Sequence, residues 1–212
     1  MDQAIETVLA ELDERARREW QGGPQGAAAM TGDVRDRMLL SIGRDAGVLV
    51  NMLARSAGSK RILEIGTSYG YSTVWLAEAA RASGGKVISL DVADYKQAHA
   101  AEVLSRAGLR DHVEFHTGDA LEIIPRLEGG FDFVLVDLWK DLYVPVLDLV
   151  FPKLAPGAIV VADNMLRPAY DQPHALAYRR AVRAKPGVAS VLLPVGQGLE
   201  ISRLKGREDE GL

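Results

Sequence analysis

Acidic and amide side chains follow two apolar runs of this sequence, at the point where each run ends. Asp137 follows residues 131–136 (FDFVLV), and Asp163 and Asn164 follow residues 158–162 (AIVVA). Carboxylate and amide oxygens are hard ligands of the kind that Mg²⁺ binds, and Mg²⁺ keeps several water or substrate oxygens in its octahedral shell. Because the group contains no histidine or cysteine, zinc is disfavoured. The pattern therefore predicts a site for Mg²⁺ or another divalent cation.

A lysine lies close to this group. Lys140 follows Asp137 by three positions in the stretch VDLWKDLY. A divalent cation lowers the pKa of a hydroxyl that it binds and orients that hydroxyl. A nearby amine can then take the proton as a general base. The combination predicts a site that activates a substrate hydroxyl as a nucleophile.

Simpler interpretations of these residues stay open. Asp and Asn are common turn residues, so Asp163 and Asn164 could begin a turn ahead of Arg167 and Pro168. Lys140 could lie on a solvated helix face. Acidic residues at the ends of two consecutive predicted strands favour the metal site over both interpretations.

A glycine-rich turn follows an earlier apolar run. Residues 61–65 (RILEI) lead into GTSYGYS, where Gly66 follows the expected strand and Gly70 begins the expected helix. Glycine permits the positive φ of a tight turn and lets a ligand approach the backbone. The dinucleotide pattern G-x-G-x-x-G would need further glycines where this chain has Ser68 and Tyr71, which disfavours an NAD-dependent oxidoreductase. The wider turn suits a ligand without a phosphate.

Further acidic residues lie at or near the ends of neighbouring runs. Asp91 ends the second run, about 20 residues past the glycine-rich turn, where an acidic residue binds the ribose of a nucleoside cofactor. Asp119 follows the third run, between Gly118 and Ala120, and Glu64 lies just inside the end of the first run. Each Asp could instead be a helix N-cap. Their order and spacing together favour a nucleoside-cofactor site.

Strand-length apolar runs alternate with amphipathic stretches of helical spacing. This alternation indicates an α/β fold with a doubly wound, mostly parallel sheet covered on both faces. The last two runs are separated by little more than GQG, which indicates an antiparallel C-terminal hairpin at one edge of a seven-stranded sheet. Ligands of such sheets bind beyond the C-terminal ends of the strands, where the polar residues above would lie. The expected strands are residues 61–65, 86–90, 112–116, 131–136, 158–162, 188–194 and 199–204.

The expected domain organisation has two parts. Residues 1–29 would form an N-terminal helix and a linker that contains Gly and Pro, and residues 30–212 would form the main domain. A chain of 212 residues is long enough for one full-sized core. The helix could cover the site as a lid or pack on a second subunit, so a homodimer stays open.

The composition excludes several classes of function. The absence of cysteine excludes disulfides, thiolate metal sites and cysteine nucleophiles. The acidic, amphipathic start does not resemble a secretory signal, and no apolar run approaches the ~20 residues of a membrane span, so a cytoplasmic protein is expected. The net charge of −4 disfavours nucleic acid as a partner. Arginine groups within residues 35–44 and 179–183 nevertheless keep an RNA substrate open.

Residues 30–204 resemble the cation-dependent O-methyltransferases, the family of catechol O-methyltransferase and the caffeoyl-CoA enzymes. EIGTSYGYS is similar to the family's loop for S-adenosyl-L-methionine (SAM), VDLWKDLY to a segment of the catechol enzyme, and ADNM to the metal-binding Asp-Asn. The resemblance implies a Rossmann-like methyltransferase fold. It also implies methyl transfer from SAM, with Mg²⁺ or another divalent cation, to a hydroxyl of a small catechol-like substrate.

The resemblance assigns residue roles. The catalytic base would be Lys140, and the metal ligands would be Asp137, Asp163 and Asn164. SAM would be bound by Met30, Glu64, Gly66, Thr67, Ser68, Gly70, Tyr71, Ser72, Asp91, Val92, Asp119, Ala120, Asp137 and Trp139. The substrate would contact Met30, Lys140, Asn164, Pro168 and Glu200.

The sequence also departs from this family. Asp91 stands where the family often has Glu, and Ala28 stands where the catechol enzyme has a tryptophan, which predicts a wider mouth of the substrate pocket. Glu200 could instead be a surface residue on an edge strand. Two other functions stay open: an O-methyltransferase acting on the wobble uridine of tRNA, and a catalytically inactive SAM-binding protein. The intact metal and base residues disfavour the inactive protein.

Overall fold

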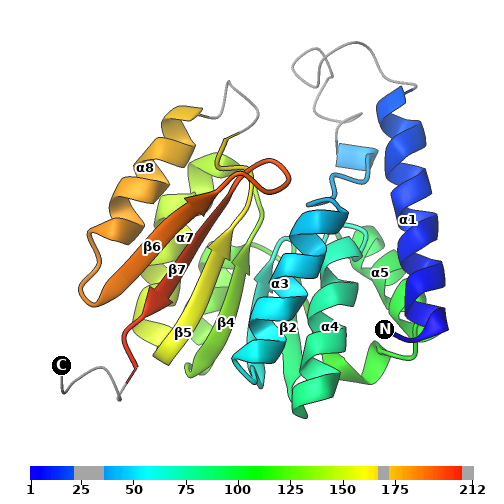
Figure 1. The fold of residues 1–212 in the computed structure, drawn as a ribbon, viewed down its shortest axis with the longest axis horizontal. Helices are drawn as coiled ribbons and strands as arrows, with labels where there is room; N and C mark the ends of the chain where they lie inside the picture. The colour runs from blue at the N-terminus through cyan, green and yellow to red at the C-terminus, as the bar shows by residue number, and fades with distance from the viewer. Residues whose placement is uncertain (22–35, 167–171, 207–212) are drawn as a thin grey trace.

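The computed structural model describes residues 1–21, 36–166 and 172–206. Its centre is a seven-stranded sheet in the order β3-β2-β1-β4-β5-β7-β6 (Figure 1). The β1, β2, β3, β4 and β5 strands pair in parallel, whereas β7 pairs antiparallel with both β5 and β6. The strands are β1 Arg61–Ile65, β2 Lys86–Asp91, β3 Val113–Thr117, β4 Phe131–Val136, β5 Leu154–Ala162, β6 Val188–Leu193 and β7 Leu199–Leu204. The predicted fold class and antiparallel hairpin edge are confirmed.

Helices cover both faces of this sheet (Figure 1). The α1, α3, α4 and α5 helices pack against one face, and α6, α7 and α8 pack against the other. The α-helices are α1 Gln3–Gln21, α3 Arg44–Ser56, α4 Tyr71–Ser83, α5 Asp94–Arg106, α6 Ala120–Ile123, α7 Tyr143–Val150 and α8 Gln172–Arg183. Single 3-10 turns are η2 Arg110–His112, η3 Ile124–Arg126, η4 Lys140–Leu142 and η5 Phe151–Lys153. None of the helices in the described ranges has the length and apolar character that a membrane crossing requires.

The protein has two hydrophobic cores, one on each face of the sheet, and each central strand contributes side chains to both. Ile62 and Phe133 point into the core under α3 and α4, whereas their neighbours Leu63 and Val134 point into the core under α7 and α8. This alternation follows from the two-residue period of a strand. Because both faces are covered, the central strands are apolar almost throughout, which is why they could be predicted as continuous runs.

The N-terminal helix is part of the same folded body. The α1 helix lies along α4 and α5 and buries an apolar stripe in the first core. The stripe consists of Ile5, Val8, Leu9 and Leu12. The predicted helix is therefore present, and most of the predicted linker falls outside the described residues.

The strand register aligns the C-terminal ends of the central strands. Ile65 lies opposite Leu90 on one side and Val136 on the other, and Val136 lies opposite Ala162. The residue that follows each of these therefore leaves the sheet at the same edge. This edge is where the sequence placed the candidate site.

The turn after β1 has no room for a side chain. Gly66 has a φ of 110°, and a Cβ on it would lie 1.9 Å from the backbone oxygen of Asp137. The Gly66 N–H donates to the carbonyl of Leu90 at 2.9 Å. The glycine thus lets the β1 turn lie directly against the end of β4.

A Gly66→Ala substitution is expected to destabilise the fold by at least about 3 kcal/mol, because the backbone of β1 or β4 must move. Gly84→Ala is the matched control, since Gly84 also has a positive φ, of 68°, but open space around its Cα. The control should lose only about 1–2 kcal/mol. Free energies of unfolding from urea titrations would decide this. Equal losses in the two variants would contradict the close approach.

Candidate active site

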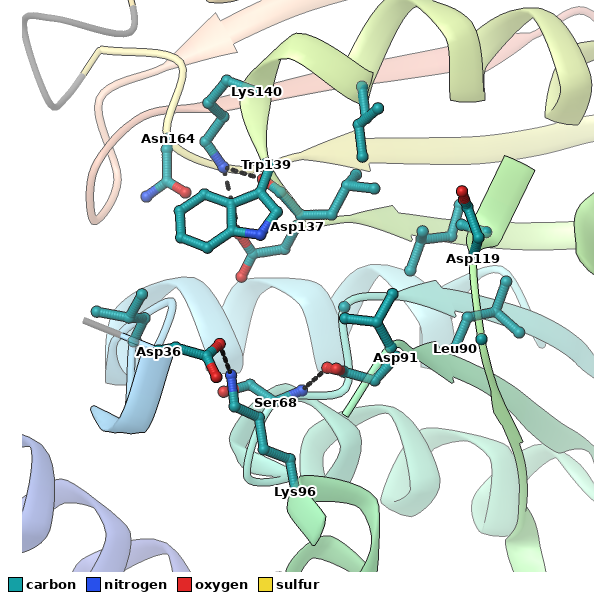
Figure 2. Close-up of a pocket in the computed structure, with 18 of the residues that line it drawn as sticks. Asp36, Ser68, Leu90, Asp91, Lys96, Asp119, Asp137, Trp139, Lys140 and Asn164 are labelled. Atoms are coloured by element: carbon teal, nitrogen blue, oxygen red, sulfur yellow. Dashed lines mark hydrogen bonds and ion pairs between the residues drawn. The ribbon is translucent and has the colours of Figure 1, made fainter. Parts of the chain in front are cut away.

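A cavity of about 220 Å³ opens beyond the C-terminal ends of the parallel strands (Figure 2). Figure 2 shows Asp91 and Asp119 toward one end of this cavity and Lys140 and Asn164 toward the other. The predicted site residues that line it are Gly66, Ser68, Asp91, Val92, Asp119, Ala120, Asp137, Trp139, Lys140 and Asn164. It is also lined by residues that the sequence did not indicate, namely Asp36, Leu40, Ile65, Leu90, Lys96, Gly118, Leu138, Leu142 and Gln197.

Asp91 is fixed by backbone donors on both sides. Its carboxylate accepts the N–H of Ser68 at 2.7 Å and the N–H of Ala93 at 2.9 Å. Ser68 reaches this position with a φ of 46°, unusual for a residue with a side chain. Each carboxylate oxygen has a second lone pair. Asp91 can therefore accept two more hydrogen bonds from hydroxyls of a ligand in the cavity.

Apolar side chains remain exposed beside Asp91. Val92 is 69% exposed and Trp139 is 47% exposed, although both line the cavity. Exposed apolar groups on the wall of a cavity suit a flat ring. Asp119 accepts the N–H of Leu121 at 2.8 Å as the N-cap of α6. The N-cap interpretation of Asp119 is thus correct, and the same residue also borders the cavity.

Two acidic side chains lie at the other end of the cavity. Asp137 lines it and has a side chain that is 16% exposed, whereas Asp163, on the adjacent strand end, is not among the lining residues. Asp163 is 1% exposed, and its Oδ1 has no hydrogen-bond partner within the described parts of the chain. Burial, followed by the charge of Asp137, holds the pKa of Asp163 well above its ordinary value. Burial also raises the pKa of Asp137, although the charge of Lys140 opposes this. An unpartnered, buried carboxylate oxygen beside a second carboxylate fits a cation.

The chemistry of this group narrows the kind of ion. Across the described ranges, no three His, Cys, Asp or Glu side chains form a cluster that could hold a metal. An ion here would therefore rest on Asp137, Asp163 and the Asn164 amide, completed by water or substrate oxygens. Such an oxygen set suits Mg²⁺.

Lys140 is buried at the edge of this group rather than solvated. Its side chain is 8% exposed, and its Nζ lies 3.5 Å from the Oδ1 of Asp137. The Nζ donates to the backbone oxygen of Leu138 at 3.0 Å and to the hydroxyl of Tyr143 at 2.5 Å. The alternative of a solvated helix residue is therefore wrong.

Several predicted residues support the glycine-rich turn from behind instead of lining the cavity. Glu64 is fully buried and accepts hydrogen bonds from the hydroxyls of Ser72 at 2.6 Å, Thr73 at 2.7 Å and Ser89 at 2.5 Å. Burial raises the pKa of Glu64 to about 7, although these three hydrogen bonds oppose the rise. The polar cluster joins the ends of β1 and β2 to the start of α4.

The remaining residues of the turn bind neighbouring elements. The hydroxyl of Thr67 lies 2.6 Å from that of Ser89, and Gly70 is the N-cap of α4. Tyr71 donates its hydroxyl to Asp13 of α1 at 2.6 Å. The turn is therefore held by both β2 and the N-terminal helix.

Glu200 of β7 is fully buried, and the structure does not bring it to the cavity. Its carboxylate accepts from Arg183 Nε at 2.8 Å and from the Ser190 hydroxyl at 2.5 Å, with Arg179 Nε at 3.5 Å. The alternative of a surface residue is therefore wrong. The hairpin residue that does line the cavity is Gln197. Met30 and Pro168 lie outside the described residues.

An ion pair that the sequence did not indicate borders the cavity. Lys96 donates to Asp36 at 2.6 Å, and the hydroxyl of Tyr95 donates to the other oxygen of Asp36 at 2.7 Å (Figure 2). The hydrogen bond from Lys96 is the main reason that the pKa of Asp36 is lowered. Because Asp36 and Lys96 are far apart in the sequence, no spacing could have revealed this contact.

The arginine groups are largely engaged by acidic side chains. Arg44 pairs with Glu6 and Asp13 of α1, and the pair formed by Arg179 and Arg183 faces Glu200. Arg44, Arg179 and Arg183 thus balance local negative charge, whereas Arg35 lies outside the described residues.

A Glu64→Gln variant is expected to change how stability depends on pH. Because the pKa of Glu64 is raised from 4.5 to about 7 in the folded state, the wild type is favoured below pH 4.5. It should lose on the order of 3 kcal/mol relative to the variant as the pH rises to about 7. Urea unfolding at several values between pH 4.5 and 8 measures this difference.

The control for this experiment is Glu122→Gln, which changes an exposed carboxylate. The control should follow the wild type at every pH. A constant difference between the wild type and Glu64→Gln across this range would contradict the raised pKa.

Residues 63–165 match the family model described as a methyltransferase domain. The chain is 35% identical over 132 residues to a catechol O-methyltransferase of Niastella koreensis, covering 60% of this chain and 59% of that protein. It is 36% identical over 143 residues to a catechol O-methyltransferase of Mycobacterium tuberculosis, covering 66% of this chain and 64% of that protein. Both alignments span less than two thirds of these curated relatives.

The fold is similar over nearly its whole length to a solved O-methyltransferase. This protein is TomG from Streptomyces achromogenes, involved in tomaymycin synthesis and solved in complex with SAM. The TM-score is 0.75 at 27% sequence identity, and the match covers 97% of this chain and 91% of that chain.

Proposed function

We propose that this chain, whose residues 63–165 match the model of a methyltransferase domain, is a SAM-dependent O-methyltransferase. Its acceptor would be one hydroxyl of a small catechol-like substrate, and a divalent cation would assist. The observation that carries the proposal is that Asp137 and the buried Lys140 line one end of the cavity, with the buried Asp163 on the adjacent strand end. A carboxylate that suits a ribose lies toward the other end.

The SAM half of the site would be built around Asp91. Its carboxylate has lone pairs left for the ribose hydroxyls, and the open backbone at Gly66 would lie against the methionine part. Val92 and Trp139 would pack against the adenine, with Asp119 at its border. TomG, a similar structure solved with SAM, supports this assignment.

The cation would be held by Asp137, Asp163 and Asn164. The unpartnered Oδ1 of Asp163 and the raised pKa of both carboxylates support this, since each lacks a nearby charge that would fully offset its own. When bound, the ion would lower the pKa of a substrate hydroxyl and orient both oxygens of a vicinal diol.

Lys140 would be the general base. Its Nζ lies beside Asp137, within reach of a hydroxyl placed at the same end of the cavity. As this proton moves to Nζ, the substrate oxygen would form its bond to the methyl carbon while the bond from that carbon to sulfur breaks. Burial of Lys140 and Asp163 would keep water from competing for the same position.

The substrate class follows from the acceptor end of the cavity. Asn164 supplies a neutral amide there, and elsewhere in the lining Leu40 and Leu142 add apolar surface and Gln197 a second amide. Apolar walls with a few polar groups suit a small aromatic diol. The relatives named catechol O-methyltransferase support the same class.

The direct test is incubation with SAM and a panel of catechols, with either Mg²⁺ or EDTA, followed by mass spectrometry for one added methyl group. The panel contains dihydroxybenzoate, caffeate and a catecholamine. Lys140→Met should lower kcat at least about 100-fold, because the base is lost but its volume is kept. Lys60→Met, at an exposed lysine, is the control and should match the wild type. Methylation of tRNA but of no catechol would refute the small-substrate proposal.

The metal site has a test that needs no substrate. Asp163→Asn removes the repulsion between the carboxylates of Asp137 and Asp163, so without metal the variant should unfold at a temperature equal to or higher than that of the wild type. Adding Mg²⁺ should raise the unfolding temperature of the wild type but not of this variant. Asp148→Asn, at an exposed carboxylate paired with Lys185, is the control that should keep the Mg²⁺ effect. Equal stabilisation of Asp163→Asn and the wild type would refute the metal site.

A further inference from the structure

A buried tyrosine lies directly behind the proposed base. Tyr143, the first residue of α7, is 0% exposed and is absent from the described lining of the cavity. Its hydroxyl accepts the hydrogen bond from Lys140 Nζ at 2.5 Å and donates to the backbone oxygen of Asp163 at 3.2 Å. One hydroxyl thus joins the proposed base to the strand end that carries a proposed metal ligand.

Lys140 needs such a partner because its own chain is flexible and its ion pair with Asp137 is long, at 3.5 Å. It begins η4, a single 3-10 turn, and its four-carbon stem has many rotamers. Leu138 and Tyr143 accept the two hydrogen bonds that Nζ donates. Loss of either hydrogen bond would let the side chain change rotamer and carry the amine away from this position.

The two hydrogen bonds leave one tetrahedral position of the Lys140 nitrogen without a hydrogen-bond acceptor. An amine nitrogen has four tetrahedral positions, and the stem, the Leu138 oxygen and the Tyr143 hydroxyl account for three of them. In the neutral amine the fourth position is the lone pair that takes a proton. Asp137, which lines the cavity, has its Oδ1 3.5 Å from Nζ.

We propose that Tyr143 is a positioning residue that, with the Leu138 carbonyl, aims the remaining valence of Lys140 Nζ at the substrate hydroxyl. The inference rests on the proposed function, since it gives Lys140 a proton to accept. Tyr143 touches neither substrate nor cofactor in this arrangement and acts only through the lysine.

The tyrosine is itself held rigidly. Its ring meets that of Tyr178 edge to face, with centroids 5.5 Å apart, inside the second core. Donation to the Asp163 oxygen fixes the hydroxyl proton, so a lone pair remains directed at Lys140. A hydroxyl held in this way can fix the orientation of the Lys140 amine, whereas a water molecule in its place would be free to move with the amine.

The same core offers a matched control. Tyr178 is also 0% exposed, but its hydroxyl has no hydrogen-bond partner among the described residues. Tyr143→Phe and Tyr178→Phe each remove one buried hydroxyl from the same aromatic pair. Only Tyr143→Phe removes an acceptor of Lys140.

The kinetic test compares these variants with Lys140→Met and the double variant Lys140→Met/Tyr143→Phe. Tyr143→Phe should lower kcat about 10- to 100-fold and leave the KM values for SAM and catechol within about 2-fold, because a small misplacement of the base slows chemistry rather than binding. Tyr178→Phe should keep the wild-type kcat. In the Lys140→Met background, Tyr143→Phe should cause no further loss, since both changes act through one group.

A crystal structure of ligand-free Tyr143→Phe supplies a readout that does not depend on activity. Lys140 Nζ is expected to leave its wild-type position or to adopt several rotamers. An unmoved Nζ, a wild-type kcat in Tyr143→Phe, or an equal further loss in the Lys140→Met background would each overturn the inference. A wild-type protein that methylates no substrate would refute the proposed function instead, and the crystal structure would still test the positioning.

Discussion

The repulsion between Asp137 and the buried carboxylate of Asp163 is the constraint on which the rest of the site depends. Asp137 and Asp163 both leave the ends of adjacent, paired strands, so neither can move away from the other without breaking the sheet. Burial and their mutual charge raise the pKa of Asp163 far above its ordinary value. Lys140 offsets part of this charge, and Asp163 Oδ1 is left without a partner in the described structure. The fold therefore tolerates a local loss of stability that a bound cation would remove. Such a loss is typical of a site that serves a ligand rather than the stability of the fold.

The sheet sets this geometry before any loop contributes. The pairing of Ile65 with Val136, and of Val136 with Ala162, places three strand ends at one level. Gly66 then lets the β1 turn lie against the backbone of Asp137, so the two halves of the cavity meet without a side chain between them. Precision at the site thus comes from hydrogen-bonded backbone, which is the most rigid part of the molecule.

The sequence predicted the site residues that lie at the C-terminal ends of the parallel strands, and few of the others. Residues such as Asp91 and Asn164 could be found because strand ends are visible as the ends of apolar runs and must meet in space. Glu64 and Tyr71 were assigned to the cofactor by resemblance, but a strand alternates its faces and α4 begins at Tyr71, so both side chains point to supporting contacts. Lys96 could not be found, since its contact with the cavity depends on how α5 meets a segment distant in the sequence.

The two ends of the cavity differ in how they are built, and this bears on how specificity can change. The end around Asp91 is fixed by backbone donors, so substitutions there would disturb the sheet edge itself. The opposite end is built on Asp137 and Asn164 at strand ends, and the lining also includes side chains from turns, among them Leu40 before α3 and Gln197 in the β6–β7 hairpin. Glu200 of the same hairpin is neutralised by arginines of α8, which anchors the hairpin so that Gln197 can vary without loss of the fold. A constant methyl-donor half and a replaceable acceptor half would allow one scaffold to serve different diols while the metal and base stay in place.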